Sequence, residues 1–170
     1  MGRSEVRFGG FGGQGIVLAG TLLGKAASLY DGQEAVFTQS YGPEARGGAS
    51  RADVIIAPEP VDYPYVTDPD VLAVLFQEAY TKFGADLRPG GLLIVEEDLV
   101  TPEAGVSAVT LPATRIAEEL GRRIVANVVL LGCLLRHTDI VSREAVEQAI
   151  RDTVKPAAVD LNLEALSAGF

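Results

Sequence analysis

The feature that most constrains the fold is a run of glycines near the start of the chain. Five glycines fall within the seven positions of Gly9-Gly10-Phe11-Gly12-Gly13-Gln14-Gly15. The apolar residues Val6 and Phe8 alternate before the run, as in a strand, and apolar residues at helical spacing follow it over about 14–30. A strand, a glycine-rich turn and a helix form the opening unit of a parallel α/β sheet.

The same glycines are typical of a turn that another group approaches closely. Gly10, Gly12 and Gly15 spell G-x-G-x-x-G, and glycine permits positive φ and close contact with the backbone. Free amides at the start of the helix favour an anion. The occupant is either a phosphate or a loop of a neighbouring subunit. We expect Gly12→Val to disturb this turn, because a branched side chain would fill the space of that approach.

The rest of the chain continues the α/β pattern. Strands are predicted at 34–39, 49–57, 71–76, 92–95 and 106–111, and helices around 79–87, 113–120, 124–135, from 142 and at 161–166. Prolines make 58–69 an irregular connection. We therefore predict an α/β fold in a single domain, 1–170: a mainly parallel twisted sheet with helices on both faces and a helical C-terminal third.

Composition excludes several classes of function. A net charge of −9 argues against a nucleic-acid surface, and the twelve apolar residues at 124–135 are too few to span a membrane. One cysteine, Cys133, cannot hold an iron–sulfur cluster, and one histidine, His137, cannot build a catalytic zinc site with it. We expect no metal, and no cofactor bound by this chain alone. The N-terminus lacks a signal-peptide pattern, which favours a cytoplasmic protein.

A second conspicuous loop runs Ser40-Tyr41-Gly42-Pro43-Glu44-Ala45-Arg46-Gly47-Gly48. It follows the carboxyl end of a predicted strand, where α/β sheets bind ligands. Arg46 has two possible partners. It either makes a charge-assisted hydrogen bond to a phosphate or carboxylate, which contributes about 1.5–3 kcal/mol, or forms a surface ion pair with Glu44, which contributes about 0–1 kcal/mol. If the two loops leave the same end of the sheet, they face each other across one crevice.

The other conspicuous polar residues are more typical of structural roles than of catalytic ones. Three acids at 96–98 end a buried strand and are typical of a solvated edge. Asn127 in the apolar helix predicts a buried polar contact, Cys133 a small core residue and His137 a helix-end cation. The helix 124–135 is buried either within the domain or against another chain. No catalytic residue is predicted.

A nicotinamide cofactor fits poorly. It needs an acidic residue at the carboxyl end of the second strand, but that strand ends Thr38-Gln39-Ser40, and Asp31 and Glu34 lie at its start. A stand-alone NAD(P)-binding reductase and a small phosphate-ligand binding module remain the alternative functions.

Several stretches together resemble the gamma subunit of the 2-oxoacid:ferredoxin oxidoreductases. They are Gly10 to Gly15, the run from Gln39 to Ser50, Ala126-Asn127 and Leu131-Gly132, and the similarity extends to Gly169. The run 39–50 and Asp62-Tyr63-Pro64 look most like the 2-oxoglutarate type. We expect the cofactor-binding residues to come from the two loops: Gly10, Gly12, Gly13, Gln14, Gly15, Ser40, Tyr41, Gly42, Glu44, Arg46, Gly47 and Gly48.

The resemblance implies a subunit of an enzyme that oxidatively decarboxylates a 2-oxoacid and forms an acyl-coenzyme A. Thiamine diphosphate and the iron–sulfur clusters belong to other subunits, namely alpha, beta and a ferredoxin-like delta chain, and ferredoxin accepts the electrons. The gamma chain is non-catalytic on its own and helps to cover coenzyme A. In isolation, its apolar helix makes a homo-oligomer plausible.

Overall fold

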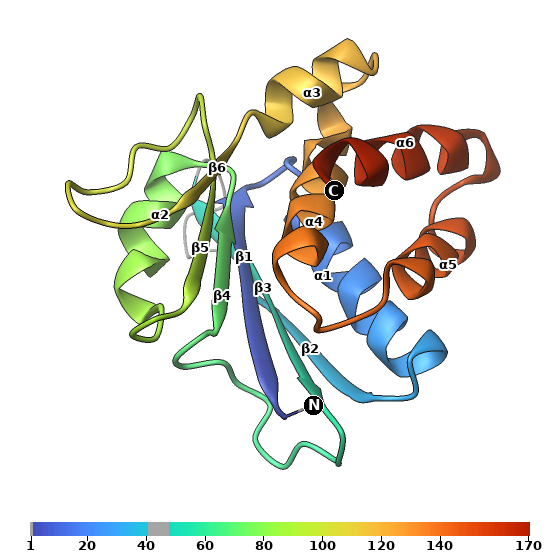
Figure 1. Cartoon of the computed structure of the whole chain (residues 1–170), viewed down its shortest axis with the longest axis horizontal. Coiled ribbons are helices and arrows are strands. Elements are labelled where there is room, and N and C mark those ends of the chain that lie inside the picture. Colours follow the sequence, from blue (N-terminus) through green and yellow to red (C-terminus); the bar gives the residue numbers. More distant parts are fainter. Residues whose placement is uncertain (1, 41–47) are drawn as a thin grey trace.

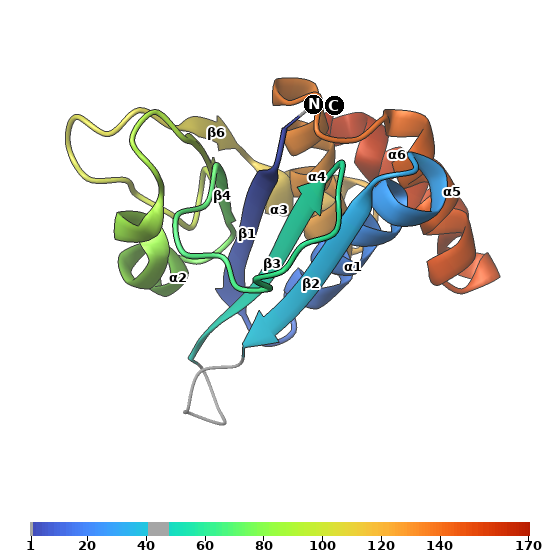
Figure 2. The ribbon, with the colours of Figure 1, turned by 90° about the horizontal axis from the view of Figure 1, so that it is seen from below.

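The computed structural model describes residues 2–40 and 48–170, and a six-stranded sheet runs through its middle (Figures 1 and 2). The strand order across the sheet is β2-β3-β1-β4-β5-β6. The strands are β1 (Ser4–Phe11), β2 (Glu34–Ser40), β3 (Ala49–Ala57), β4 (Val71–Val74), β5 (Leu92–Glu96) and β6 (Val109–Leu111). All of the predicted strands are present.

The sheet is mainly parallel, as predicted. β1 pairs with β4, β4 with β5 and β5 with β6 in parallel, while β3 runs antiparallel to β1 and β2. The reversal of β3 has a simple cause. Only residues 41–48 separate β2 from β3, and a crossover to a parallel neighbour needs a dozen residues or more.

Helices lie on both faces of the sheet, as predicted (Figure 1). They are α1 (Ile16–Lys25), α2 (Gln77–Phe83), α3 (Ala113–Glu119), α4 (Ala126–His137), α5 (Arg143–Thr153) and α6 (Val159–Gly169). A π-helical turn, Ala26–Tyr30, extends α1, and 3-10 turns occur at Gly84–Asp86, Arg123–Val125 and Pro156–Ala158. α2 covers one face, and α1 and α4 cover the other with α5 and α6 packed behind them (Figure 1).

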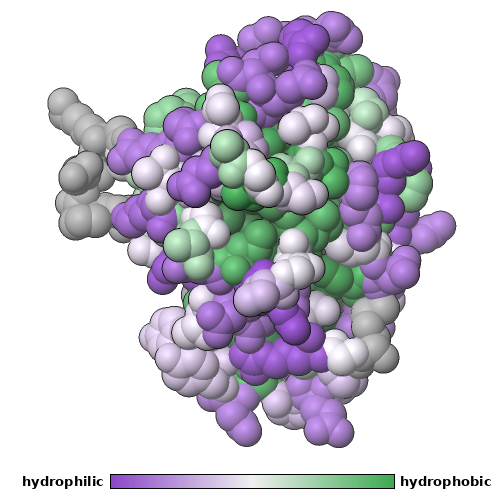
Figure 3. All heavy atoms as spheres, turned by 60° about the vertical axis from the view of Figure 1, so that its left-hand side comes forward, coloured by the Kyte–Doolittle hydropathy of each residue, from purple (hydrophilic) through white to green (hydrophobic). Residues whose placement is uncertain are grey.

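Alternation along β1 divides the core into two parts. Val6 and Phe8 point into the larger part, between the sheet and helices α1 and α4. A smaller part lies under α2 and includes Val74 and Phe83. Figure 3 brings the α2 side of the molecule forward and shows apolar surface between polar side chains on that side.

Helix α4 is buried within this chain. Of the two alternatives that its apolar composition allowed, burial in the domain is therefore the one observed. Residues 126–135 are all buried, and α6 packs along the helix. The two helices approach very closely at their glycines. A Cβ added to Gly132 would lie 2.2 Å from the Leu166 carbonyl oxygen, and one on Gly169 would lie 1.9 Å from that of Val129.

Several element ends differ from the prediction. β6 begins at Val109 rather than at 106, and Ile124 belongs to a 3-10 turn before α4 rather than to the helix. α6 extends over Val159–Gly169, beyond the predicted 161–166. Periodicity identifies the middle of an element, whereas its ends depend on local hydrogen bonds. The start of α5 is as predicted, because the Ser142 side chain accepts a hydrogen bond from the Ala145 amide.

None of the helices in residues 2–40 and 48–170 combines the length and apolarity needed to cross a bilayer.

Candidate functional site

The carboxyl ends of β1 and β2 lie at the same end of the sheet. Phe11, the last residue of β1, is opposite Ala49 at the start of β3. Ser40, the last residue of β2, is opposite Arg51, two positions further along β3. The glycine-rich turn and the residues that flank segment 41–47 therefore share one end of the sheet, as predicted from the sequence.

The glycine-rich turn is held in shape by its own chain. Gly13 and Gly15 have positive φ angles of 95° and 74°, which favour glycine. Gly15 stands at the start of α1, and its carbonyl oxygen accepts a hydrogen bond of 2.9 Å from Asn127 Nδ2. The expected buried polar contact of Asn127 is thus confirmed, and it joins α4 to the start of α1.

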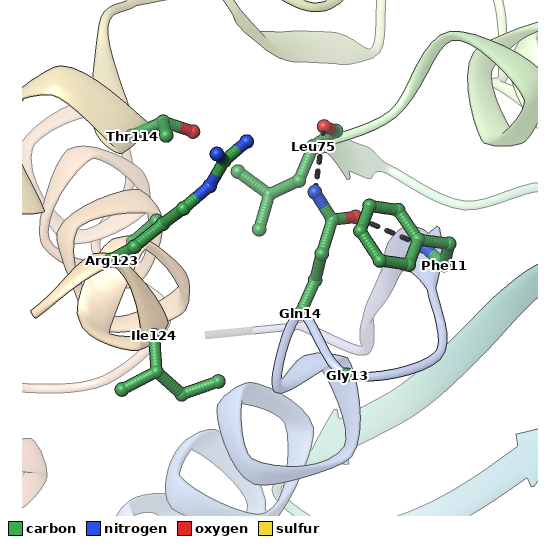
Figure 4. Close-up of a pocket in the computed structure, with 8 residues that line it drawn as sticks. Phe11, Gly13, Gln14, Leu75, Thr114, Arg123 and Ile124 are labelled. Carbon is green, nitrogen blue, oxygen red and sulfur yellow. Dashed lines mark hydrogen bonds between the residues drawn. The ribbon is translucent and has the colours of Figure 1, made fainter.

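Gln14 connects the ends of two neighbouring strands (Figure 4). Its Oε1 accepts a hydrogen bond of 3.0 Å from the Phe11 amide, and its Nε2 donates one of 3.2 Å to the Leu75 carbonyl oxygen. Both polar atoms of this predicted cofactor-binding side chain are therefore engaged within the chain. A structural role for Gln14 follows directly from these bonds.

Gly10 and Gly12 differ in their surroundings. Gly10 lies within β1, and a Cβ there would come within 2.8 Å of the Ile16 side chain and 2.7 Å of Gln14 Oε1. Gly12 is exposed, and a Cβ there would meet nothing within 4 Å. The expectation that Gly12→Val disturbs the turn is wrong for the chain itself, because the open side of the turn faces outward.

A hollow of about 250 Å³ lies beside this turn (Figure 4). The turn supplies one wall, and α3 and the 3-10 turn before α4 supply the opposite wall. The exposed Arg123 extends its guanidinium into the space between Thr114 and Leu75 (Figure 4). The hollow is lined by Phe11, Gly13, Gln14, Leu75, Thr114, Arg123, Ile124 and Ala126.

A second, shallower hollow of about 280 Å³ adjoins the first around Gly12 and Gly13. Val17, Ser50 and the exposed Ile124 also line it. This end of the sheet therefore offers an apolar floor, a cation and exposed loop backbone. Such a set of groups suits a ligand with an anionic part and an apolar part.

Sequence reasoning missed Arg123 and Thr114. Arg123 stands directly before the apolar stretch 124–135, and Thr114 lies inside the predicted helix 113–120. Nothing in the spacing of either residue relates it to the glycine run. A signal was present in Arg122-Arg123, two cations at a connection that returns the chain to the carboxyl end of the sheet.

Part of the predicted site lies outside the described residues. These predicted residues are Tyr41, Gly42, Glu44, Arg46 and Gly47. The choice between an anion and Glu44 as the partner of Arg46 falls there too. Of this loop, Ser40 ends β2 and Gly48 immediately precedes β3.

A family model described as pyruvate ferredoxin/flavodoxin oxidoreductase matches residues 5–170. The chain belongs to this family.

Two individual proteins are similar to this chain over nearly its whole length. The chain is 54% identical to the 2-oxoglutarate synthase subunit KorC of Methanocaldococcus jannaschii, over 99% of this chain and 92% of that protein. It is 45% identical to the crystal structure of the keto/oxoacid ferredoxin oxidoreductase gamma subunit from Geobacter sulfurreducens, with a TM-score of 0.88 over 98% of this chain and 96% of that one. The predicted resemblance to the gamma subunits is confirmed.

A more distant relative is longer than this chain. The ketoisovalerate oxidoreductase subunit VorA of Methanothermobacter thermautotrophicus is 36% identical over 97% of this chain, and the match spans 35% of VorA.

In this pyruvate ferredoxin/flavodoxin oxidoreductase family member, the three acids at 96–98 do not form one solvated edge. Glu96 is fully buried, and burial raises the pKa of its carboxyl, an effect that hydrogen bonds from neighbouring amides partly offset. Only Glu97 and Asp98 are exposed, and both pair with Arg115. The expectation of a solvated edge is therefore wrong for Glu96, because its carboxyl accepts hydrogen bonds from the Asp98 and Thr114 amides instead of facing water.

Cys133 and His137 lie near each other at the C-terminal part of α4. Cys133 is buried, and burial raises the pKa of its thiol, which makes it a weak nucleophile. His137 is exposed at the end of α4, where its Nδ1 lies 2.9 Å from the Cys133 carbonyl oxygen. The core position of Cys133 and the place of His137 at a helix end agree with the positions expected from the sequence.

The acids that a nicotinamide ribose would need stand at the other end of the sheet. Glu34 begins β2 opposite Ala57, and the Asp31 carboxylate accepts hydrogen bonds from the amide and hydroxyl of Ser142. Asp31 thus supports the start of α5. This placement counts against the NAD(P)-binding alternative for this family member.

Proposed function

We propose that this chain is the gamma-type subunit of a 2-oxoglutarate:ferredoxin oxidoreductase, which converts 2-oxoglutarate and coenzyme A to an acyl-coenzyme A with ferredoxin as electron acceptor. The ranking of relatives supports this substrate. Identity is 54% to a 2-oxoglutarate synthase subunit and 36% to a ketoisovalerate oxidoreductase subunit. The sequence motif around 39–50 favours the same type.

Companion subunits would carry the decarboxylation and the electron transfer. Cys133 is the only cysteine and lies in the core. In the part of the chain that the structure describes, no three His, Cys, Asp or Glu side chains gather as metal ligands. These residues do not fit an iron–sulfur cluster. We therefore assign the clusters and thiamine diphosphate to alpha, beta and a ferredoxin-like delta subunit, with residues 1–170 as one domain docked on them.

The carboxyl end of the sheet is the part of this chain that we assign to coenzyme A. Arg123 extends into the hollow beside the exposed backbone of Gly13, and Gly12 lines the adjoining hollow. A guanidinium and the amides at a helix start both suit phosphate. The hollow's apolar wall suits the less polar arm of the ligand. Gly10, Gly15, Gln14, Ser40 and Gly48 would shape this surface, and Tyr41, Gly42, Glu44, Arg46 and Gly47 would complete it.

The substrate test uses the assembled complex. The chain is co-expressed with the companion alpha, beta and delta subunits of the same organism, and reduction of ferredoxin is followed with 2-oxoglutarate, pyruvate or 3-methyl-2-oxobutanoate. We expect 2-oxoglutarate to give the highest kcat/KM, and the isolated chain to reduce no ferredoxin. A complex that prefers pyruvate would contradict the substrate, and turnover by the isolated chain would contradict the division of labour.

The coenzyme A test changes one side chain. Arg123→Ala removes a charge-assisted hydrogen bond worth about 1.5–3 kcal/mol, so the KM for coenzyme A should rise by about tenfold or more with the KM for 2-oxoglutarate unchanged. Arg88→Ala is the control, because Arg88 pairs with Asp70 at the opposite end of the sheet. An unchanged KM for coenzyme A in Arg123→Ala would remove the hollow from the proposal.

A further inference from the structure

Glu96 is a fully buried carboxyl group for which the described part of the chain supplies no cationic partner. It ends β5, at the carboxyl end of the sheet, and its side chain has no exposed surface. Asp53 is also buried, but it pairs with Arg7. Within residues 2–40 and 48–170, no Lys, Arg or His lies within ion-pair distance of Glu96. Burying such a group costs free energy unless it is well hydrogen-bonded.

Backbone amides from two separate segments satisfy this carboxyl. Its Oε2 accepts a hydrogen bond of 3.0 Å from the Asp98 amide, in the turn that follows β5. Its Oε1 accepts one of 3.4 Å from the Thr114 amide, in the first turn of α3. One side chain therefore joins the end of β5 to the start of α3.

An exposed link spans the same gap. Arg115, the next residue of α3, binds Asp98 and Glu97 at 2.9 and 2.7 Å. Both of these acids are exposed to water, so their pairs with Arg115 are screened by solvent. The buried contact of Glu96 is the one that solvent does not weaken.

The position of α3 determines one wall of the hollow. Thr114 lines the hollow directly, and Glu118, one turn further along α3, lies 3.7 Å from the guanidinium of Arg123. Figure 4 shows Thr114 and Arg123 on one side of the hollow, with Gly13, Gln14 and Phe11 on the other. A shift of α3 would therefore move the cation and the hydroxyl relative to the glycine-rich turn.

We infer that Glu96 is a positioning residue, which fixes α3 so that Thr114 and Arg123 stand opposite the glycine-rich turn at the distance that coenzyme A requires. This inference rests on the proposed function, because it takes coenzyme A as the ligand of the hollow. Glu96 touches no ligand and acts through the Thr114 amide. Titratable groups with perturbed pKa values concentrate at functional sites, and the raised pKa of Glu96 agrees with such a place.

The test is Glu96→Gln in the assembled enzyme. Glutamine has the same size, but its amide nitrogen accepts no hydrogen bond, so one of the two segments loses its acceptor. We expect the KM for coenzyme A to rise about three- to tenfold, as for the loss of one hydrogen bond, with kcat within about twofold. Glu97→Gln is the control at the neighbouring exposed position, and its KM should stay near wild type.

Hydrogen exchange separates positioning from general loosening. In the Glu96→Gln complex, the amides of α3 should exchange faster, while those of α1 keep the wild-type rate. Faster exchange in both helices would overturn the inference, and so would an unchanged rate in α3 for both Glu96→Gln and Glu96→Asp. Glu96→Asp provides a second variant, because it keeps the charge but shortens the side chain by one methylene group. We expect it to raise the KM as well, and a wild-type KM would overturn the inference, because the shorter side chain cannot reach the Thr114 amide in the same way.

Arg123→Ala distinguishes failure of this inference from failure of the proposed function. If Arg123→Ala raises the KM for coenzyme A and Glu96→Gln leaves it unchanged, Glu96 has no positioning role and the hollow still binds coenzyme A. If neither variant changes the KM, the assignment of coenzyme A to the hollow is itself wrong.

Discussion

Asn127 Nδ2 donates a hydrogen bond of 2.9 Å to the carbonyl oxygen of Gly15, across 112 positions of sequence. This bond holds the start of α1 against the start of α4. A Cβ added to Gly15 would lie 2.3 Å from the same Asn127 nitrogen. Gly15 is therefore required by its neighbour as well as by its backbone conformation.

Gly15→Ala should destabilise the fold, whereas Gly12→Ala should not. The first change places a side chain at φ 74° and against Asn127, which together should lower the free energy of unfolding by about 3 kcal/mol. The second places one where nothing lies within 4 Å, so its effect should stay within about 0.5 kcal/mol. Urea unfolding of both variants measures the difference. Equal losses would show that the turn tolerates neither change.

The glycines between α4 and α6 predict a similar contrast. Gly132→Ala would drive a methyl group to 2.2 Å from the Leu166 backbone, and the helices must separate, at about 3 kcal/mol. Gly24→Ala in α1 is the matched control, because its Cβ would meet only Val54 at an ordinary 3.8 Å. Alanine is the better helix former, so this control should gain up to about 1 kcal/mol. In thermal unfolding, the Tm of Gly132→Ala should fall below that of wild type, and the Tm of Gly24→Ala should rise above it.

Glu96 predicts a pH dependence of stability with a definite sign. Burial raises the pKa of its carboxyl in the folded chain above the ordinary value of 4.5. As pH rises past 4.5, the unfolded chain loses the Glu96 proton before the folded chain does. The stability that protonated Glu96 contributes is therefore complete at lower pH, and it declines until the pH passes the folded-state pKa. Glu96→Gln lacks this decline.

The stability of Glu96→Gln relative to wild type should therefore increase from about pH 4.5 towards neutral pH. Each unit by which the folded-state pKa is raised adds about 1.4 kcal/mol to the change. Urea titrations at a series of pH values measure the difference, with Glu97→Gln as the exposed control. A constant difference across this range would contradict a raised pKa for Glu96.

Much of the fold could be predicted from the sequence, because each element carries its own pattern. The alternation of Val6 and Phe8, the apolar run of β4 and the Ser142 cap all report on local structure. The direction of β3 was not considered, although the short 41–48 connection between two strands was a usable signal. The close packing of Gly132 against α6 depends on segments 34 or more positions apart, which no local pattern records.

The site was predicted less completely than the fold. The shared end of the sheet for the two loops followed from the strand–turn–helix pattern. Arg123 and Thr114 enter the site only because α3 and α4 return to that end, which is a tertiary effect. The prediction for Glu96 was wrong for a similar reason. A run of acids is usually solvated, but the first of these is buried and accepts a hydrogen bond from Thr114, which is 18 positions further along the chain.

Arg7 and Asp53 form a buried ion pair. Removing one partner should lower the free energy of unfolding much more than replacing both partners with apolar residues. They stand opposite each other in the β1–β3 ladder, joined by two hydrogen bonds of 2.8 and 3.0 Å. Burial alone would lower the pKa of Arg7, but the charges and hydrogen bonds of Asp53 and Asp86 raise it overall. The guanidinium therefore stays charged, and Asp53→Asn should cost about 3–5 kcal/mol by leaving that charge underpaired.

Replacing both partners should recover most of the loss caused by Asp53→Asn. In Arg7→Met/Asp53→Val, apolar side chains closer in volume to the original pair would fill the space beside Phe83, so no unpaired charge remains buried. The Asp86 carboxylate is 41% exposed and can return to water. The exposed Arg115→Met serves as a control that should leave stability near wild type. Urea unfolding measures the stability of each variant. A double variant less stable than Asp53→Asn would contradict this prediction, because it would show that the ion pair itself stabilises the centre of the sheet.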